Sequence, residues 1–371
     1  MWMEPTVISI SKLTLDESTE EAVLRVLRTG QLAMGQETVD VENAFSKRFD
    51  GAQCIAVSNG TVGITLALAA MGVGPGDEVI TTSFSFIGTI EPIIQLGAIP
   101  IFADIDVETS NISVEEIKSL ITDKTKVILP VHLYGRPVDL VEIRKIAVEN
   151  GIYVLEDACQ AIGAQVEGIG EIGSTGTSVF SFYGSKNIAC GEGGLVVTDD
   201  PSIAERVKLL RSHGSIETYK HQAVGYNGRM TDLQAAILRV QFEKIDTVTM
   251  GRRGNAQYFN DSILNENIVL PPFEVGASIS CFHQYTLRLE NRKYRDDLQN
   301  WAHLHEVETR AYYPYTLSGH PVVKELGFGV SCKNAEILAN SVLSIPVRES
   351  LSLTEKEHIA EVLSAWQPHL S

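Results

Sequence analysis

Between residues 75 and 200, short apolar runs alternate with helical stretches, and this alternation restricts the fold more than any other feature. Apolar runs predict buried strands at residues 78–82, 100–105, 126–132 and 152–157, and helices are expected at residues 113–121 and 139–150. Strands that are apolar along their whole length are typical of parallel sheets covered on both faces. We therefore expect an α/β fold with a mostly parallel sheet covered by helices. In such a fold, ligands bind beyond the carboxyl ends of the strands.

The pattern changes towards the C-terminus. Further strands are expected at residues 178–183 and 194–198, followed by a helix from Pro201 to about residue 212 and a long helix from about Thr231. Beyond about residue 250, shorter strands at residues 281–289 and 307–313 alternate with helices such as 354–366. The sequence therefore predicts a large α/β domain over residues 1–250 and a smaller α+β C-terminal domain over residues 251–371.

The charge of the chain excludes several classes of partner. There are 30 Lys+Arg and 47 Asp+Glu residues, which gives a formal net charge of −17. Binding to nucleic acid or to an anionic membrane surface depends on a surplus of cations, so we expect neither partner. The most apolar region, residues 84–102, is interrupted by Pro92 and Pro100 and is not expected to span a membrane.

The cysteines and the N-terminus bear on the cellular compartment. The 5 cysteines are scattered and form neither a CxxC pair nor a Cys/His metal spacing, so we expect no disulfide framework and no metal site. The N-terminal segment lacks a basic region followed by an apolar stretch, so we expect no secretory signal. These features predict a cytoplasmic protein.

Three short segments carry residues suited to chemistry. Asp157 ends the strand predicted at residues 152–157, Lys186 follows the strand predicted at residues 178–183, and residues 58–61 (SNGT) open an apolar helix. Each has a structural alternative when taken singly. Asp157 could cap a helix or lie in a solvated loop, Lys186 could be a surface cation, and residues 58–61 could be a simple N-cap.

Together, the three segments match the requirements of an enzyme that uses pyridoxal 5'-phosphate (PLP). A lysine forms an imine with the PLP aldehyde, and a carboxylate keeps the pyridine nitrogen protonated. The free N–H groups at the start of a helix bind the phosphate. We therefore predict PLP as the cofactor, held by Lys186, Asp157 and the helix that follows residues 58–61.

Several blocks of sequence also carry a family resemblance: SNGTVGITL (58–66), PVHLYG (130–135), EDACQA (156–161), FSFYGSKNIACGEGG (180–194) and GYNGRMTDLQAA (225–236). The last three are specific in their order and spacing. The chain resembles the DegT/StrS family of PLP-dependent sugar aminotransferases, which have fold type I. The resemblance covers most of the chain and weakens after about residue 250.

The resemblance implies roles for individual residues. Lys186 would be the Schiff-base lysine and the general acid/base, Asp157 would pair with the pyridine nitrogen, Gln160 would reach the phenolic oxygen, and Phe86 would stack on the ring. Gly60, Thr61 and Ser181 would bind the phosphate, and Asn227 would reach the cofactor of a neighbouring subunit. The resemblance therefore also implies a homodimer with a shared active site.

Structural alternatives stay open for several of these residues. Phe86 could be part of the core, Gln160 could cap a following helix, Ser181 could bond within a turn, and Asn227 could form a turn beside Gly228. His283 and Tyr313 also lie where the family often has substrate-facing residues, and we expect both to be packing residues.

The resemblance implies an aminotransferase that moves an amino group, from L-glutamate, to a keto group of a nucleotide-linked sugar. Lysine at position 186 favours transamination over dehydration, because related dehydratases have histidine there. Two alternatives stay open. One is a keto-cyclitol aminotransferase of aminoglycoside synthesis, and the other is a regulatory protein that binds PLP without catalysis.

Overall fold

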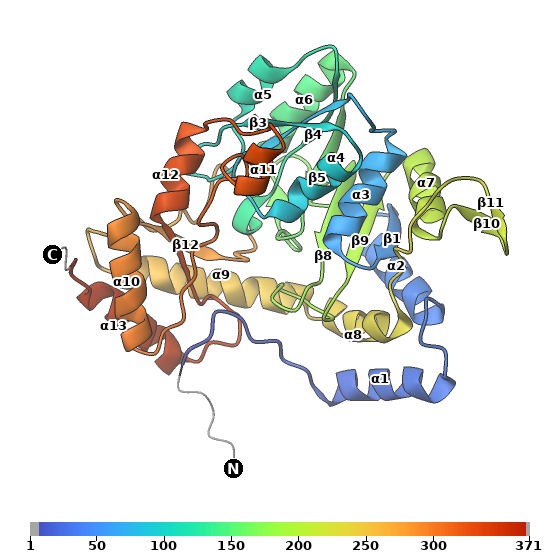
Figure 1. Cartoon of the computed structure of the whole chain (residues 1–371). Helices are drawn as coiled ribbons and strands as arrows, with labels where there is room; N and C mark the ends of the chain where they lie inside the picture. Colours follow the sequence, from blue (N-terminus) through green and yellow to red (C-terminus); the bar gives the residue numbers. More distant parts are fainter. Residues whose placement is uncertain (1–6, 369–371) are drawn as a thin grey trace.

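A seven-stranded sheet forms the centre of the computed structural model, which describes residues 7–368 (Figure 1). Its strands are β1 (Gln53–Val57), β2 (Glu78–Thr82), β3 (Ile99–Ala103), β4 (Thr125–Leu129), β5 (Tyr153–Asp157), β8 (Thr177–Ser181) and β9 (Gly194–Thr198). Their order in the sheet is β1-β9-β8-β5-β4-β2-β3. Only β9 runs antiparallel to the other strands of this sheet. The predicted mostly parallel sheet is confirmed, although the sequence analysis missed β1.

Helices cover both faces of the sheet. Those in the first two thirds of the chain are α1 (Glu17–Thr29), α2 (Gln36–Arg48), α3 (Gly60–Ala70), α4 (Glu91–Gln95), α5 (Val114–Leu120), α6 (Leu140–Asn150), α7 (Pro201–Arg211), α8 (Asp232–Phe242) and α9 (Ile245–Ser262). Two single-turn 3-10 helices, η1 (Ile87–Thr89) and η2 (Leu133–Gly135), follow β2 and β4. Ser113 and Asp139 accept hydrogen bonds from the backbone at the starts of α5 and α6, as N-cap residues do.

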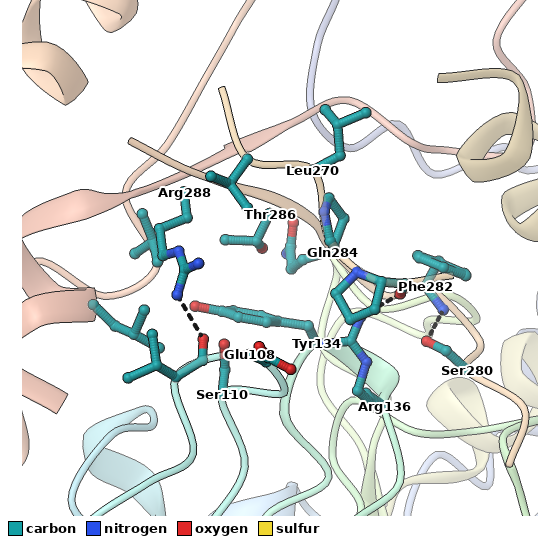
Figure 2. Close-up of a pocket in the computed structure, with 16 residues that line it drawn as sticks. Glu108, Ser110, Tyr134, Arg136, Leu270, Ser280, Phe282, Gln284, Thr286 and Arg288 are labelled. Atoms are coloured by element: carbon teal, nitrogen blue, oxygen red, sulfur yellow. Dashed lines mark hydrogen bonds between the residues drawn. The ribbon is translucent and has the colours of Figure 1, made fainter. Parts of the chain in front are cut away.

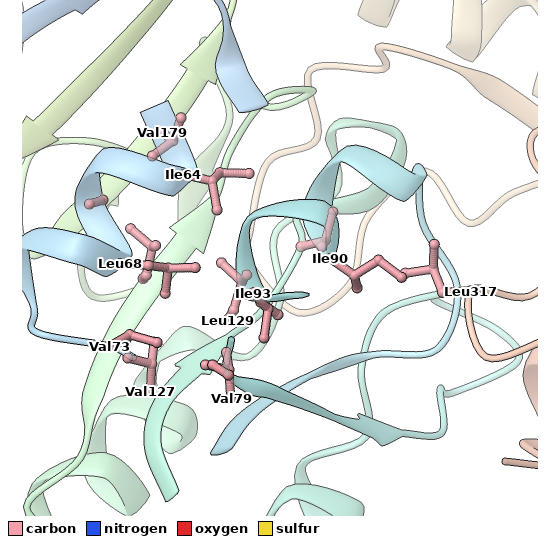
Figure 3. Close-up of a cluster of buried hydrophobic side chains, with 14 of the residues drawn as sticks. Ile64, Leu68, Val73, Val79, Ile90, Ile93, Val127, Leu129, Val179 and Leu317 are labelled. Atoms are coloured by element: carbon pink, nitrogen blue, oxygen red, sulfur yellow. The ribbon is translucent and has the colours of Figure 1, made fainter. Parts of the chain in front are cut away.

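Side chains of the strands alternate between two buried clusters, one on each face. Ile55 and Val57 of β1 belong to one cluster, and Cys54 and Ala56 belong to the other. Figure 3 shows the first cluster, in which Ile64 and other α3 side chains lie against the strands. Burial of both faces explains why the strands are apolar along their whole length.

The C-terminal part is smaller and mixed in structure. It contains a two-stranded antiparallel sheet of β12 (Tyr285–Arg288) and β13 (Val342–Ile345), together with α10 (Arg292–Leu304), α11 (Pro321–Glu325), α12 (Lys333–Ser341) and α13 (Leu353–Ala365). A separate buried cluster that includes Phe259, Leu298 and Trp366 packs this part. Residue 250, where the sequence predicts the domain boundary, lies within α9.

Some predicted elements differ from the structure. The strand expected at residues 307–313 is wrong. Within residues 7–368, Val307 pairs only with Ile8 and Arg310 only with Ser344, so no continuous ladder forms. The strand expected at residues 281–289 is reduced to β12, because Cys281 bonds to Gly135 instead. The long helix expected from Thr231 is divided into α8 and α9, and the capping box at its start is present.

Two further features concern the surface and the termini. The short hairpins are β6 (Gln165–Val166) with β7 (Gly170–Glu171), and β10 (Ser215–Glu217) with β11 (Lys220–His221). Figure 1 shows β10 and β11 projecting from the edge of the molecule beside α7. Across residues 7–368, no helix combines the length and apolar character needed to cross a membrane. Residues 1–6, part of the segment used to judge a secretory signal, lie outside the described residues.

Candidate active site

The three segments selected from the sequence meet at one edge of the sheet. Strand β5 ends at Asp157, and its neighbour β8 ends at Ser181. Helix α3 begins at Gly60, shortly after β1. A Cβ atom at Gly60 would lie 2.7 Å from Sγ of Cys159 and 3.0 Å from Cβ of Ser181. The start of α3 therefore touches the ends of both strands, and this contact requires glycine at position 60.

Asp157 presents a buried carboxylate at the end of β5. One carboxylate oxygen accepts a hydrogen bond from the Thr89 hydroxyl at 2.7 Å, and the other accepts one from the Cys159 N–H at 3.1 Å. Each oxygen can accept a second bond, so Asp157 can still pair with a cationic N–H group.

Lys186 lies in the loop that follows β8. The backbone N–H of Lys186 donates to the Tyr183 carbonyl at 2.8 Å, which closes a tight turn. Burial lowers the pKa of the Lys186 amine, and the nearby Cys159 and Asp157 oppose that shift. The amine is therefore close enough to Asp157 to interact electrostatically, and a larger fraction of it is neutral at a given pH than for an exposed lysine.

The start of α3 provides backbone donors. The Asn59 side chain caps the helix by accepting a hydrogen bond from the Val62 N–H at 2.9 Å. The first N–H groups of a helix have no partner within the helix and carry its positive dipole end. Gly60 and Thr61 are the first two residues of α3. Ser181 lies beside Gly60, and its hydroxyl accepts a weak bond from the Tyr183 N–H at 3.4 Å.

Phe86 is 56% exposed, so the structure does not support the core alternative for this residue. Its ring centroid lies 6.1 Å from that of Tyr313. A Cβ atom at Gly88 would lie within 3.0 Å of both the Phe86 ring and the Thr61 hydroxyl. Phe86 therefore adjoins Thr61 at the start of α3 and leaves a ring face open.

Gln160 is fixed by two hydrogen bonds. Its side-chain oxygen accepts from the Tyr134 N–H at 2.7 Å, and its amide nitrogen donates to the Tyr313 hydroxyl at 3.1 Å. The residues that follow form turns rather than a helix, so the capping alternative for Gln160 is wrong. The second N–H of the amide remains available to a ligand.

Asn227 stands apart from the other predicted residues. It is exposed, and its backbone pairs with Ser212 in an isolated bridge. The next residue, Gly228, accepts a hydrogen bond from the Ser58 N–H at 2.8 Å, so the segment runs beside the loop before α3. Within residues 7–368, no hydrogen bond or ring contact joins the Asn227 side chain to the other predicted residues.

Sequence reasoning missed three contributors to this site. Thr89 bonds to Asp157, and Tyr134 bonds to Gln160 through its backbone. Tyr313, expected to be a packing residue, touches both Gln160 and Phe86. His283, also expected to be a packing residue, is buried and bonds to Asn187 at 2.9 Å, and burial and the Lys186 charge lower its pKa.

A buried ion-pair network supports β5 behind Asp157. Glu156 receives hydrogen bonds from Arg144 at 2.8 Å and from the His132 ring at 3.1 Å. The other ring nitrogen of His132 accepts from the Val138 N–H, so the proton lies on the nitrogen that faces Glu156. The backbone N–H of His132 donates to the Asp157 carbonyl at 3.1 Å. The network therefore fixes the backbone on both sides of the Asp157 carboxylate.

A mostly parallel sheet with a lysine and a carboxylate beyond the ends of neighbouring strands is the architecture of fold-type I aminotransferases. The chain belongs to the DegT/DnrJ/EryC1/StrS aminotransferase family, whose sequence profile matches residues 13–364. The family resemblance and the predicted fold class are thereby confirmed, and the protein is an aminotransferase.

Individual relatives match over nearly their whole length. The chain is 38% identical to the pleiotropic regulatory protein of Geobacillus stearothermophilus, over 98% of this chain and 100% of that protein. It is 36% identical to the UDP-N-acetyl-3-dehydro-alpha-D-glucosamine 3-aminotransferase of Acidithiobacillus ferrooxidans, over 91% of each protein. It also aligns with the crystal structure of DesV from S. venezuelae at a TM-score of 0.90 and 31% identity, over 95% of each chain.

Proposed function

We propose that this chain is a PLP-dependent aminotransferase that moves an amino group from L-glutamate to the keto group of a nucleotide-linked sugar. One arrangement carries the proposal: Asp157 ends β5, Lys186 follows the neighbouring strand β8, and α3 begins in contact with the ends of those strands. The Acidithiobacillus ferrooxidans relative, named for a UDP-linked 3-dehydro sugar, supports the substrate class.

The residues present fit PLP. Asp157 has a lone pair left on each oxygen, so it can accept a hydrogen bond from a protonated pyridine nitrogen. Gly60 has no side chain to block the first N–H groups of α3, which can bind a phosphate together with the hydroxyls of Thr61 and Ser181. The exposed Phe86 face would cover the ring, and the free N–H of Gln160 would reach the phenolic oxygen.

When bound, PLP supplies an electron sink for the charge that develops when the donor loses its α-proton. The Lys186 amine takes that proton, and only its neutral form can do so. Burial lowers the pKa of Lys186, which raises the neutral fraction near neutral pH. The Asp157 carboxylate would pair with the protonated nitrogen of the cofactor ring.

The first test concerns the lysine. The purified protein reconstituted with PLP should show a visible absorbance band that is absent from Lys186→Ala. Lys124→Ala is the matched control, because Lys124 is exposed and makes no side-chain bond among the described residues, so its band and turnover should equal those of the wild type. A Lys186→Ala protein that keeps both the band and turnover would overturn the assignment.

The second test separates the acceptors. Adding L-glutamate to the PLP form should bleach the visible band, and a nucleotide-linked keto sugar should restore it. A keto-cyclitol is the alternative acceptor, and restoration by the cyclitol alone would replace the sugar in the proposal. Failure of glutamate to bleach the band, with another amino acid succeeding, would replace the donor.

A regulatory protein that binds PLP without catalysis is the second candidate. The relative named a pleiotropic regulatory protein, 38% identical to this chain, is the observation that favours it. The two candidates differ in one measurement. A catalytic protein produces 2-oxoglutarate from glutamate in amounts that exceed the amount of enzyme when acceptor is supplied, whereas a purely regulatory protein does not.

The homodimer is also part of the proposal. The hairpin of β10 and β11 and the segment after it expose Ile216, Tyr219, Val224 and Tyr226, and large apolar side chains gathered on a projecting segment are suited to contact with another subunit. Asn227 follows directly, where it would reach the phosphate of the partner's cofactor.

A mixing experiment tests the shared site. Lys186→Ala and Asn227→Ala each impair every site of a homodimer, but a mixed dimer has one site with both residues intact. Random exchange of subunits should therefore restore about a quarter of wild-type activity. Absence of restoration, with subunit exchange verified by light scattering and mass labels, would place Asn227 outside a shared site.

A further inference from the structure

A cavity lies beside Tyr134, the residue whose backbone N–H bonds to the Gln160 side chain. It has a volume of about 220 Å³ and is lined by residues of the β3–α5 loop, the segment around η2, and the C-terminal part. Figure 2 shows the Tyr134 ring crossing this cavity, with Arg288 at one end and Arg136 at the other. None of the residues that we assign to PLP lines it.

The lining is cationic, although the chain has a net charge of −17. It contains Arg136, Arg288 and a single acidic residue, Glu108. Arg136 is only 7% exposed, and burial lowers its pKa to about 10, so it remains charged at neutral pH. Within residues 7–368, neither arginine forms an ion pair with a carboxylate. A buried cation without a carboxylate partner is unusual in a protein interior.

The arginines keep donors that the protein does not use. Arg136 donates to the carbonyls of Thr109 and Pro272, at 3.2 and 2.7 Å. Among the described residues, Arg288 donates only to the Val107 carbonyl, at 3.3 Å. Since a guanidinium has five N–H donors, each arginine has several left to bind an anion.

The rest of the lining is mixed. The side-chain amide of Gln284 has no hydrogen-bond partner in the part of the chain that the structure describes, whereas its backbone N–H donates to the Tyr134 carbonyl at 3.2 Å. Apolar side chains, including Val269, Leu270 and Phe282, form another part of the wall. A ligand would therefore meet guanidinium groups and an amide on some sides and hydrocarbon on others.

We propose that this cavity binds a small aliphatic carboxylate, with its charged end at Arg288 and its hydrocarbon part against the apolar wall, while Arg136 adds positive charge at the other end. Planar guanidinium groups match the geometry of a carboxylate. Val269, Leu270 and Phe282 on the apolar wall suit a short branched hydrocarbon chain. The proposal does not depend on the proposed aminotransferase reaction.

The experiment compares isovalerate with isovaleramide, a neutral molecule of nearly the same shape, by isothermal titration calorimetry. It uses the PLP-loaded full chain and the Lys186→Ala variant, so that binding at the PLP site is separated from binding at the cavity. We expect isovalerate to bind both proteins equally and isovaleramide to bind at least tenfold more weakly. Loss of isovalerate binding in Lys186→Ala would overturn the proposal, and so would equal binding of acid and amide.

Two variants test the cavity itself. Arg288→Gln removes one unpaired cation, and a charge-assisted hydrogen bond corresponds to a loss of about ten- to hundredfold in affinity. Glu108→Gln removes the acidic group and should tighten binding, because Glu108 is exposed and its carboxylate makes no bond among the described residues. Unchanged affinity in both variants would overturn the site. Binding of inorganic phosphate in place of isovalerate would overturn the carboxylate assignment.

Discussion

A methyl group added at position 60 tests whether α3 touches the strand ends as the structure indicates. In Gly60→Ala, the new Cβ would lie 2.7 Å from Sγ of Cys159 and 3.0 Å from Cβ of Ser181. Carbon atoms pack best at about 3.5–4.0 Å, so one contact or both must open. The helix start would then move away from the strand ends that form the rest of the site.

The magnitude follows from two opposing effects. Overpacking of a tight interior costs about 1–3 kcal/mol. Replacing glycine by alanine in a helix contributes at most about 1 kcal/mol in the other direction, and less at the first helical position. We therefore expect the free energy of unfolding to fall by about 1–2 kcal/mol, with a weaker affinity for PLP because the phosphate donors are displaced.

A double-mutant cycle identifies the contact responsible. In a Cys159→Ala background the closest clash is gone and only the contact with Ser181 remains, so Gly60→Ala should cost about 1 kcal/mol less than it does in the wild type. Urea unfolding of the four apoproteins measures the coupling, and PLP titration gives the affinities. Gly74→Ala is the control, because nothing lies within 4 Å of a Cβ there. An equal cost of Gly60→Ala in both backgrounds would refute the contact.

Three further predictions concern the charged and hydrogen-bonding groups of the site. Asp157→Asn removes the anion and should weaken PLP binding by about 1.5–3 kcal/mol in a titration of apoprotein, whereas unchanged affinity would contradict the pairing. Tyr313→Phe removes the Gln160 acceptor and should lower the free energy of unfolding by about 1 kcal/mol, together with turnover. Burial lowers the pKa of Lys186 below its ordinary 10.5, so the unfolded chain binds more protons between the two pKa values. The unfolding free energy of apoprotein should therefore rise with pH across that window, and a Lys186→Met variant that shows the same rise would contradict this.

Much of the central sheet could be predicted because burial of both faces leaves a strong sequence signal. Strands β2, β4 and β5 are apolar runs separated by helices of ordinary length, so their number and direction follow from the pattern. The signal fails where pairing is irregular. Residues 307–313 are apolar enough for a strand, but two different partners, Ile8 and Ser344, take its first and fourth residues.

The residues of the candidate site also fall into two groups, those that the sequence predicts and those that it does not. Asp157 could be placed because it ends a strand that was predicted from local pattern, whereas Ser181 lies inside the predicted strand 178–183 and was selected from the family resemblance. The residues that bond to the site residues could not be predicted from the sequence, because they lie in distant parts of the chain. Thr89 is 68 residues from Asp157, and Tyr313 is 153 residues from Gln160. No local pattern marks either residue, since each is positioned by how the C-terminal part or a loop packs against the sheet.

The sequence blocks that carry the family resemblance are also the segments that constrain one another in space. Gly135, in PVHLYG, has a positive φ of 86°. A Cβ atom there would lie 2.5 Å from Sγ of Cys281 and 2.9 Å from the Gln160 carbonyl oxygen of the EDACQA block. The neighbouring Tyr134 bonds to the Gln160 side chain. A change in one block therefore displaces a residue of another block at the site, which is a physical reason for the blocks to occur together.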